Sequence, residues 1–492
     1  MIGITPKSKD FSAWYNEVVL KAELADYAPV KGCMVIRPNG YAIWEAIQQY
    51  LDQKFKALGV QNAYFPLFIP ESFLKKEKEH VEGFSPQLAV VTIGGGEELK
   101  EKLIVRPTSE TIMYDMYAKW IKSHRDLPLL LNIWNNVVRW EKRTYLFLRT
   151  TEFLWQEGHT AHATFEDADT FAHTILSLYK TFDESVLAIP VVVGKKSQSE
   201  KFAGAHTTYT LEALMPDGKA LQLGTSHNLG DNFAKAFNIR FQDEKGELKF
   251  AWQTSWAETT RVIGALIMVH GDDQGLVLPP KLAPVQVVIV PIKRQQATGS
   301  PSTPLRAGKQ PASRQGGQGE YVKKIFQELE SARIRVKVDD REEYSPGWKF
   351  NEWELKGVPI RLEIGEKEIA EDSITVVRRD TGEKFKIQSS EFRIKIEKLL
   401  EEIQKNLFER ARKFLEENTH TVDSYDDFKQ IMKTKRGFIR AFWCKDAGCE
   451  TKIKAETKAS TRVLPLDAKE EKGKCIYCGK EARHLWYFAQ AY

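Results

Sequence analysis

The segment TEFLWQEGHTAHAT, residues 151–164, has the alternating pattern of a β-strand with one unusual face. Side chains two positions apart in a strand point to the same side, so Phe153, Trp155, Glu157 and His159 share a face. Aromatic rings on a strand most often belong to a core, but a buried carboxylate and imidazole are costly there unless they are paired. The combination favours a strand whose inner face lines a binding site.

Other short strand patterns surround this segment between residue 11 and about residue 278. They are AYFPLFI, LIVRP, VVVG and GKALQLGTSH, and helical patterns occur at FSAWYNEVVLKAEL and GYAIWEAIQQYLDQKFKALG. Few of these strands are separated by the helix that a parallel crossover needs, so we expect a mostly antiparallel sheet with flanking helices. The glycine-rich IGGGEELK, residues 93–100, lacks the lysine of a phosphate-binding loop and is predicted to be a hairpin turn.

Three domains are predicted from the change of pattern along the 492 residues. The proline-rich LVLPPKLAPVQ ends a domain at 1–280. The strands VQVVIVPI, RIRVKVDD and PIRLEIG then alternate with helical segments, which predicts a small α/β domain at 284–390 with a mostly parallel sheet. Residues 294–319 are poor in large apolar side chains and are expected to form a disordered insertion. The last domain, 391–492, is expected to be small and α+β, and it begins with an amphipathic helix at Phe392.

Polar side chains with complementary charge occur in several segments of the first domain. KLIVRPTSE ends in Thr108 and Glu110, and NNVVRWEKR carries Arg139 and Glu141 two positions apart. An Arg-x-Glu pattern alone is weak, because exposed strands often alternate charges for solubility. Together with the face of residues 153–159, these segments suit an anionic ligand with a planar base beside a small cation. Further candidates follow in LQLGTSH and SWAETTRVIG, namely Gln222, Thr225, His227, Ser255, Thr259 and Arg261.

Four of the five cysteines lie in the last fifty residues with the spacing C-x4-C-x25-C-x2-C. Two thiolate pairs satisfy tetrahedral zinc, and a site closed by four sulfurs is structural. The alternative is four incidental thiols, which the CIYCG turn makes the weaker interpretation. We therefore expect a structural zinc ion held by Cys444, Cys449, Cys475 and Cys478.

Charge and hydropathy exclude several classes of protein. The 72 basic and 67 acidic residues leave a net charge of +5, so any surface for nucleic acid must be a local patch. We expect no membrane partner, because no stretch approaches the ~18–20 apolar residues of a membrane helix. The first residues have no apolar secretory segment, and the clustered cysteines favour metal binding over disulfides. The expected location is the cytoplasm.

Several long motifs, in the same order, resemble the prolyl-tRNA synthetases, which are class II aminoacyl-tRNA synthetases. GYxxW with YFPLFIP resembles the first class II motif, VVRWE with FLWQEGH the second, and SWAETTRVIGALIMVHGDDQGLVLPP the third. RPTSE and SEKFAGA resemble two further elements of the family, and PGWKFNxWExKGVPxRxEIG resembles its anticodon-binding domain. The C-terminal module ending in Tyr492 is similar to that of the archaeal and eukaryotic branch. The similarity covers nearly the whole chain, with the 294–319 segment as the main departure.

The resemblance implies an enzyme that activates L-proline with ATP and Mg²⁺ and transfers proline to tRNA(Pro). The first domain would then be a class II catalytic domain and the second an anticodon-binding domain. The implied proline-binding residues are Thr108, Glu110, Arg139, Phe153, Trp155, Glu157, His159, Phe202, His227 and Ser255. The implied ATP-binding residues are Arg139, Glu141, Arg149, Thr150, Gln222, Thr225, Thr259 and Arg261, with Arg139 and Arg261 catalytic. The implied anticodon contacts are Arg341, Lys349, Glu354 and Arg361.

Two other interpretations remain open at this point. A paralogue without activity would be a binding module, although it would be expected to lack Arg139, Glu141 or Arg261, and all three are present. Another class II specificity, such as threonine or histidine, is also open. Thr108 and Glu110 with the aromatic strand favour proline, but alanine and cysteine fit similar pockets, and one small group is worth about 1–3 kcal/mol. The resemblance further implies a homodimer formed through the first motif.

Overall fold

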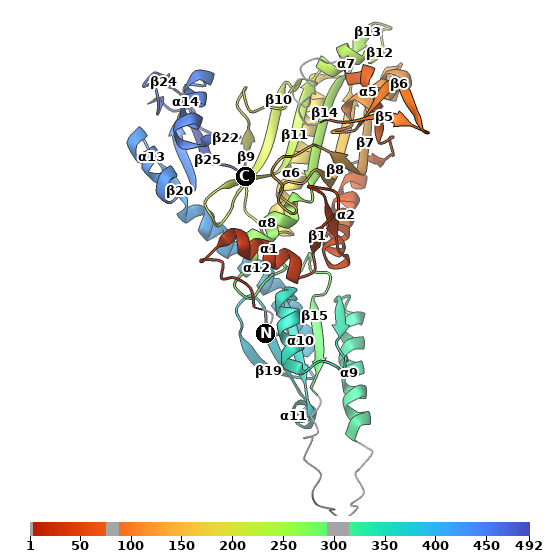
Figure 1. Ribbon diagram of the computed structural model, residues 1–492, viewed down its shortest axis with the longest axis vertical. Coiled ribbons are helices and arrows are strands. Elements are labelled where there is room, and N and C mark those ends of the chain that lie inside the picture. The colour runs from red at the N-terminus through yellow and green to blue at the C-terminus, as the bar shows by residue number, and fades with distance from the viewer. Residues whose placement is uncertain (1–2, 75–87, 293–313) are drawn as a thin grey trace, which may run out of the picture. The chain divides into compact units, whose positions relative to one another are not determined.

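The computed structural model describes residues 3–74, 88–292 and 314–492, and within these the largest sheet has eleven strands. Neighbouring strands are antiparallel except for the first and the last pair. This confirms the prediction of an antiparallel sheet in the catalytic part (Figure 1). The strand order is β20 (Thr419–Thr421), β21 (Phe438–Phe442), β25 (Leu485–Gln490), β22 (Ala459–Pro465), β9 (Val192–Lys195), β10 (Thr207–Leu214), β11 (Ala220–Gly230), β14 (Trp252–Thr259), β8 (Glu152–His162), β7 (Leu129–Val138) and β3 (Gln61–Asn62).

The chain divides into two compact units. One unit contains Met1–Leu24, Pro38–Ala46 and His270–Glu409, and the other contains Ala25–Arg37, Ile47–Val269 and Arg410–Tyr492. The eleven-stranded sheet belongs to the second unit. The domain bounds expected from the sequence stay a prediction.

One face of the large sheet is covered by helix α6 (Phe165–Ser185), which packs on β8, β10, β11 and β14. The helix begins at Thr164, whose hydroxyl accepts a hydrogen bond from the Asp167 amide at 3.1 Å. Its apolar side chains recur at helical spacing and are buried against the strands, with Tyr179 and Phe182 fully inaccessible. The face opposite α6 is therefore the one available for a ligand.

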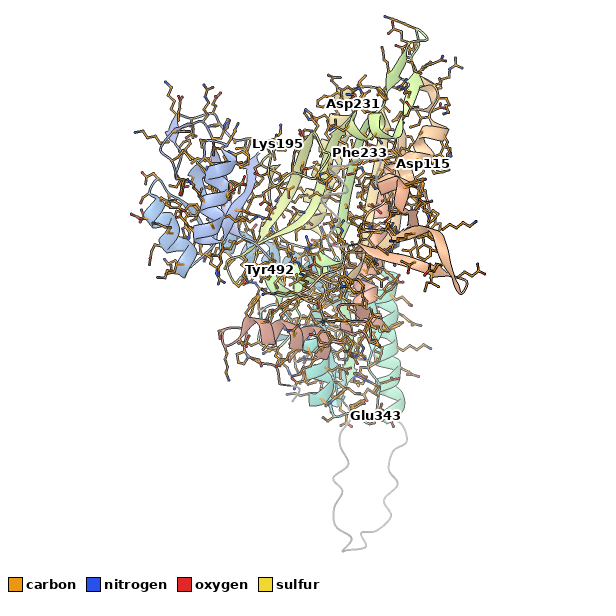
Figure 2. The ribbon with its side chains drawn as sticks, turned by 45° about the horizontal axis from the view of Figure 1, so that its top comes forward. Asp115, Lys195, Asp231, Phe233, Glu343 and Tyr492 are labelled. Carbon is orange, nitrogen blue, oxygen red and sulfur yellow. The ribbon has the colours of Figure 1, made fainter. Side chains whose placement is uncertain are left out.

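Two short helices close one end of the sheet. Helix α5 (Glu110–Trp120) and helix α7 (Asn232–Phe237) pack together, and the rings of Tyr114 and Phe233 are 5.4 Å apart. Figure 2 labels Phe233 on α7 and Asp115 on α5. This apolar contact fixes the first turn of α5 relative to β7 and β8, because both helices belong to one buried cluster with Leu131 and Ile133.

Smaller elements of the second unit include the expected hairpin. Strand β5 (Ala89–Gly94) pairs with β6 (Glu97–Val105) through a two-residue turn at Gly95 and Gly96, both with positive φ. That geometry is a type I′ turn, so the prediction for residues 93–100 is confirmed. The other elements of this unit are β1 (Ala25–Tyr27), β2 (Met34–Ile36), β4 (Phe68–Pro70), α3 (Glu71–Leu74), a 3₁₀ turn at His124–Asp126, β12 (Arg240–Gln242), β13 (Leu248–Phe250), α13 (Tyr425–Thr434), α14 (Ala447–Thr457), β23 (Gly473–Lys474) and β24 (Glu481–Ala482).

The first unit holds a five-stranded sheet in the order β16 (Val336–Val338), β15 (Val287–Pro291), β17 (Ile360–Ile364), β18 (Ser373–Arg378) and β19 (Lys384–Gln388). The first three strands are parallel, as predicted, but β18 and β19 are antiparallel additions that make the sheet mixed. Helices α1 (Phe11–Lys21), α9 (Arg314–Ser331), α10 (Pro346–Leu355) and α11 (Glu366–Ala370) belong to this unit. Three further helices are α2 (Pro38–Ala57), α8 (Arg261–His270) and α12 (Phe392–Glu417).

The expected disordered insertion at 294–319 needs a correction at its C-terminal end. Most of it, up to residue 313, lies outside the described residues. Residues 314–319, however, form the first turns of α9. The Gln318 side chain anchors them, because its amide donates to the carbonyls of Ile292 and Ile364 at 3.2 and 2.9 Å.

In the described residues, no helix combines the length and apolar character of a membrane span.

Candidate active site

A cavity of about 240 Å³ lies on the sheet face opposite α6, over β8, β11 and β14. All ten side chains expected to bind proline line it. Five of the eight expected to bind ATP also line it, including Arg139, which belongs to both sets. The lining residues are Thr108, Glu110, Arg139, Phe153, Trp155, Glu157, His159, Glu200, Phe202, Thr208, Gln222, Leu223, Thr225, His227, Ser255, Trp256, Ala257, Thr259 and Arg261. The alternating face expected of residues 153–159 is therefore present, as is the period of two along β11 and β14.

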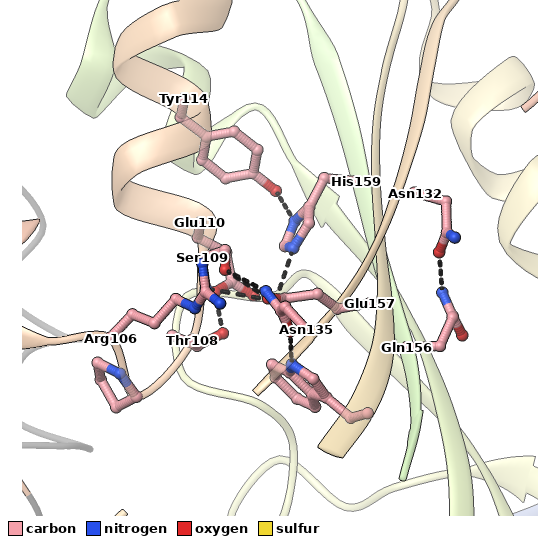
Figure 3. Close-up of polar contacts among 12 residues, drawn as sticks. Arg106, Thr108, Ser109, Glu110, Tyr114, Asn132, Asn135, Gln156, Glu157 and His159 are labelled. Atoms are coloured by element: carbon pink, nitrogen blue, oxygen red, sulfur yellow. Dashed lines mark hydrogen bonds and ion pairs between the residues drawn. The ribbon is translucent and has the colours of Figure 1, made fainter. Parts of the chain in front are cut away.

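The floor of the cavity contains a buried carboxylate, that of Glu157, with protein donors on both oxygens (Figure 3). It accepts hydrogen bonds from the Ser109 amide at 3.3 Å, from the Ser109 hydroxyl and from the Asn135 side chain at 2.9 Å. The His159 Nε2 lies 3.0 Å away. Burial raises the pKa of the Glu157 carboxyl, but His159 and the Ser109 and Asn135 donors outweigh burial and hold it below its ordinary value.

His159 is held between two partners. Its Nε2 faces Glu157, and its Nδ1 lies 3.2 Å from the Tyr114 hydroxyl. Burial lowers the pKa of the imidazole, while Glu157 and Glu110 more than reverse this, so the pKa is raised. The protonated ring can donate from both nitrogens, to the carboxylate and to the tyrosine oxygen.

Thr108 and Glu110 enter the cavity from the start of α5. Glu110 is the first residue of the helix, after Ser109 at the N-cap position. Ser109 makes no capping bond, because its hydroxyl is directed to Glu157 instead. The Thr108 hydroxyl donates to Glu110, and both side chains are buried. Glu110 benefits from the positive end of the helix dipole, which stabilises its carboxylate.

The opposite wall contains a neutral imidazole stacked on a ring. Phe202 and His227 have centroids 4.7 Å apart and stacked planes. Burial lowers the pKa of His227 to about 4, so the ring is uncharged near neutral pH. Thr208 positions both residues, since its hydroxyl is 2.9 Å from His227 Nδ1 and accepts from the Phe202 amide at 2.9 Å.

Arginines gather at the other end of the cavity. The Arg139 guanidinium lies over the rings of Phe153 and Trp155, at 5.5 and 5.2 Å, and its Nε donates to the Pro107 carbonyl at 2.9 Å. Arg261, the first residue of α8, donates to the carbonyls of Leu148 and Gln222. Burial, and after it the charges of Arg139 and Arg149, lower the pKa of Arg261 to about 10. Cations that repel one another in this way favour binding of an anion between them.

Family models match three segments of this chain. Residues 91–270 match the family "tRNA synthetase class II core domain (G, H, P, S and T)", residues 286–406 match "Anticodon binding domain", and residues 425–492 match "Prolyl-tRNA synthetase, C-terminal". The proline–tRNA ligase of Natranaerobius thermophilus is 56% identical over 491 residues, covering 99% of this chain and 98% of the relative. That of Clostridium novyi is 54% identical over 489 residues, with the same coverage of 99% and 98%. The chain belongs to the proline–tRNA ligase family.

Three residues expected to bind ATP, Glu141, Arg149 and Thr150, are not among the residues that line the cavity. Glu141 and Arg149 form a pair, with Arg149 Nε 3.6 Å from the carboxylate, and the Thr150 hydroxyl donates to the Glu152 carbonyl at 2.7 Å. These three were expected at the ATP end, and the structure places them beside the lining rather than in it.

Sequence analysis missed several residues that build the family's pocket. Ser109, Asn135 and Tyr114 fix Glu157 and His159, and Thr208 fixes His227. Asn135 is opposite Trp155 in the β7–β8 register, and its side-chain oxygen accepts from the indole at 2.5 Å. A short-range pattern signalled only Ser109, which lies inside RPTSE.

The four C-terminal cysteines come together. The sulfur of Cys444 lies 3.8 Å from that of Cys449 and 3.7 Å from that of Cys478, and all four sulfurs, with Cys475, lie within 4.8 Å of one another. Zinc–sulfur bonds of about 2.3 Å in a tetrahedron require separations of this size. The donor set therefore fits a closed four-thiolate zinc site.

The candidate anticodon residues lie in the first unit among ion pairs. Lys349 is buried, and its Nζ donates to the Asp339 carbonyl at 3.0 Å. Arg361 pairs with Glu354 at 2.7 Å and with Glu363 at 3.1 Å. Arg341 is more exposed and lies over the stacked rings of Tyr344 and Trp348, whose centroids are 3.8 Å apart. Their contact with an anticodon stays a prediction.

We expect His159→Gln to destabilise the fold in a pH-dependent way. The raised pKa of His159 means that the charged ring stabilises the wild type fully below the ordinary pKa of 6.5, and this is lost as pH rises through the raised value. Breaking the buried pair should cost about 3 kcal/mol at about pH 6 and less at about pH 9. Urea unfolding at both pH values measures it, with exposed His206→Gln as control. An equal loss at both pH values would contradict a titration of the ring between them.

Proposed function

We propose that this chain activates L-proline with ATP and transfers the prolyl group to tRNA(Pro). One observation carries the proposal: a single cavity has a paired carboxylate and hydroxyl with aromatic walls at one end and converging arginines at the other. A small cationic amino acid fits the first end, and an anionic nucleotide fits the second. The relatives' name, proline–tRNA ligase, supports this assignment.

The proline end follows from the roles of the two carboxylates. Glu157 is occupied by Ser109, Asn135 and His159, so Glu110 and Thr108 are assigned to the secondary ammonium. A buried cation requires such a carboxylate partner. Phe153, Trp155 and Phe202 would enclose the apolar ring, with His159, His227 and Ser255 completing the polar lining.

The ATP end follows from the arginines. Arg139, whose guanidinium lies over the Phe153 and Trp155 rings, would bridge the proline carboxylate and the α-phosphate, a task that suits a planar guanidinium. Glu141 would accept from the adenine amino group. The remaining contacts to ATP are assigned to Arg149, Thr150, Gln222, Thr225, Thr259 and Arg261, and Mg²⁺ bound with ATP would shield its phosphates.

The chemistry needs no general base for activation, because the proline carboxylate is already a nucleophile. Its oxygen attacks the α-phosphorus of ATP, and the bond from that phosphorus to the oxygen bridging to the β-phosphate breaks. Pyrophosphate leaves, and prolyl-adenylate is the product. Arg139 and Arg261 lower the barrier by neutralising charge that develops at the α-phosphate. The terminal hydroxyl of tRNA then attacks the prolyl carbonyl, and AMP leaves.

Arg139→Ala is expected to abolish proline-dependent ATP–pyrophosphate exchange, a loss of at least about 10²-fold. The exposed Arg125→Ala serves as a matched control that keeps wild-type exchange. Exchange is measured with each amino acid separately and without tRNA. Exchange with another amino acid would overturn the proline assignment, and its absence with every amino acid in folded wild-type protein would favour the binding-module alternative.

We further propose that the four cysteines hold one structural Zn²⁺. Cys478→Ser is expected to lower the zinc content well below one ion per chain and to lower the melting temperature. Cys33→Ser, a cysteine outside the cluster, should change neither. Elemental analysis and thermal unfolding measure the two effects. Full zinc content in the Cys478 variant would show that the cluster is not the metal site.

We propose that the chain works in the cytoplasm and forms a homodimer. Exposed apolar side chains in the second unit, among them Tyr27, Val35, Tyr64, Phe68 and Ile93, support the homodimer. Side chains of this kind gain free energy when a partner covers them. Light scattering after gel filtration should give twice the chain mass of 56.4 kDa. A mass equal to one chain at micromolar concentration would contradict the dimer.

A further inference from the structure

The C-terminal segment joins the catalytic sheet directly. Strand β22 pairs with β9, with Leu464 opposite Lys195 and Pro465 opposite Gly194 (Figures 1 and 2). The backbones approach so closely that a Cβ on Gly194 would lie 1.9 Å from the Leu464 carbonyl oxygen. Only glycine allows this contact, so β22 is held against β9 at a defined position.

A buried cluster of three charges lies next to this strand pair. Glu212 on β10 is fully buried and pairs with Lys196 at 2.6 Å. Arg462 of β22 donates to the same carboxylate, with Nε 3.1 Å from Oε2 and Nη2 2.9 Å from Oε2. Burial raises the pKa of Glu212, but Arg462 and Lys196 outweigh burial and lower it. Two cations therefore favour the ionised carboxylate, and one of them, Arg462, comes from the C-terminal segment.

A second contact reaches the cavity wall. The Glu450 carboxylate of α14 accepts hydrogen bonds from Ser197, at 3.0 Å, and from Ser199 and Thr461. These serines begin the segment that continues to Glu200 and Phe202, two residues of the cavity lining. The C-terminal module thus contacts Ser197 and Ser199, just before Glu200 of the cavity lining.

The charge cluster also borders the ATP end. Glu212 is opposite Gln222 in the β10–β11 register, and the Gln222 carbonyl accepts from Arg261 Nη1 at 3.4 Å. The negative charge of Glu212 acts on Arg261 and partly offsets the lowering of the pKa of Arg261. Displacement of Glu212 would therefore change both the position of Gln222 and the electrostatic surroundings of Arg261.

From this geometry we propose that Arg462 is a positioning residue for adenylate formation. It acts through Glu212 and Lys196 to hold Gln222 and Arg261 in the positions that bind ATP. The inference rests on the proposed function for its ATP site, but it does not require that proline be the amino acid. Its consequence is that the C-terminal module contributes to ATP binding without touching ATP.

Arg462→Met tests the proposal, since it removes the charge while keeping a long side chain. We expect the Kd for ATP with Mg²⁺, from isothermal titration calorimetry, to rise about tenfold, as expected for coupled residues in one network. The KM for ATP in exchange should rise similarly, with the proline KM little changed. Arg462→Lys keeps the charge without the two-nitrogen contact and should give a smaller rise, about threefold.

Arg483→Met is the matched control, because Arg483 forms an exposed pair with Glu470 at 2.9 Å in the same module. It should bind ATP as the wild type does. A purely structural role of Arg462 would reduce the amount of folded protein without changing the Kd or KM for ATP, and that outcome would overturn the proposal. If Arg462→Met does not fold, wild-type ATP binding by Arg462→Lys would overturn it. Calorimetry measures ATP binding without any amino acid, so its result does not depend on the proline assignment. A wrong proline assignment would be recognised separately in the exchange assay.

Discussion

The pocket depends on the buried carboxylate of Glu157. A charge without solvent must find its hydrogen-bond donors in the protein, and Glu157 draws them from α5, β7 and its own strand. Ser109 gives up its capping role for this purpose, and the start of α5 is thereby tied to the sheet. The position of Glu110, one residue further along, follows from that contact. The residue that organises the site is therefore distinct from the carboxylate assigned to the ligand.

The two ends of the cavity are prepared differently. At the end with Glu110, the Glu157 carboxylate has its donors before any ligand arrives, so it needs little rearrangement when a cation binds beside it. At the other end, burial lowers the pKa of Arg261, and repulsion from Arg139 and Arg149 lowers it further. Binding of a polyanion relieves this repulsion. Fixed charges of this kind stabilise a transition state without the cost of reorienting solvent.

Sequence patterns predicted those helices and strand faces that short-range periodicity determines. The face of Phe153 to His159 needed only the period of two, and α12 needed only the period of its buried residues, such as Ile396 and Ile403. The roles of Asn135 and Thr208 depend on register between strands, which periodicity does not contain. Glu212 and Arg462 are 250 positions apart, so no local pattern could pair them. Strands β18 and β19 were missed, and the pairing of β22 with β9 was not predicted, because a strand pattern does not specify which strand lies beside it.

The position of β22 in the large sheet also matters for chains that are incomplete. Until residues 459–465 have been made, β9 has an open edge with unpaired amide and carbonyl groups. An open edge of this kind is a template for association with other chains. A shortened product, whether from interrupted synthesis or from cleavage, would therefore expose a site for aggregation. Strand β22 therefore covers an edge of β9 that would otherwise be open to other chains.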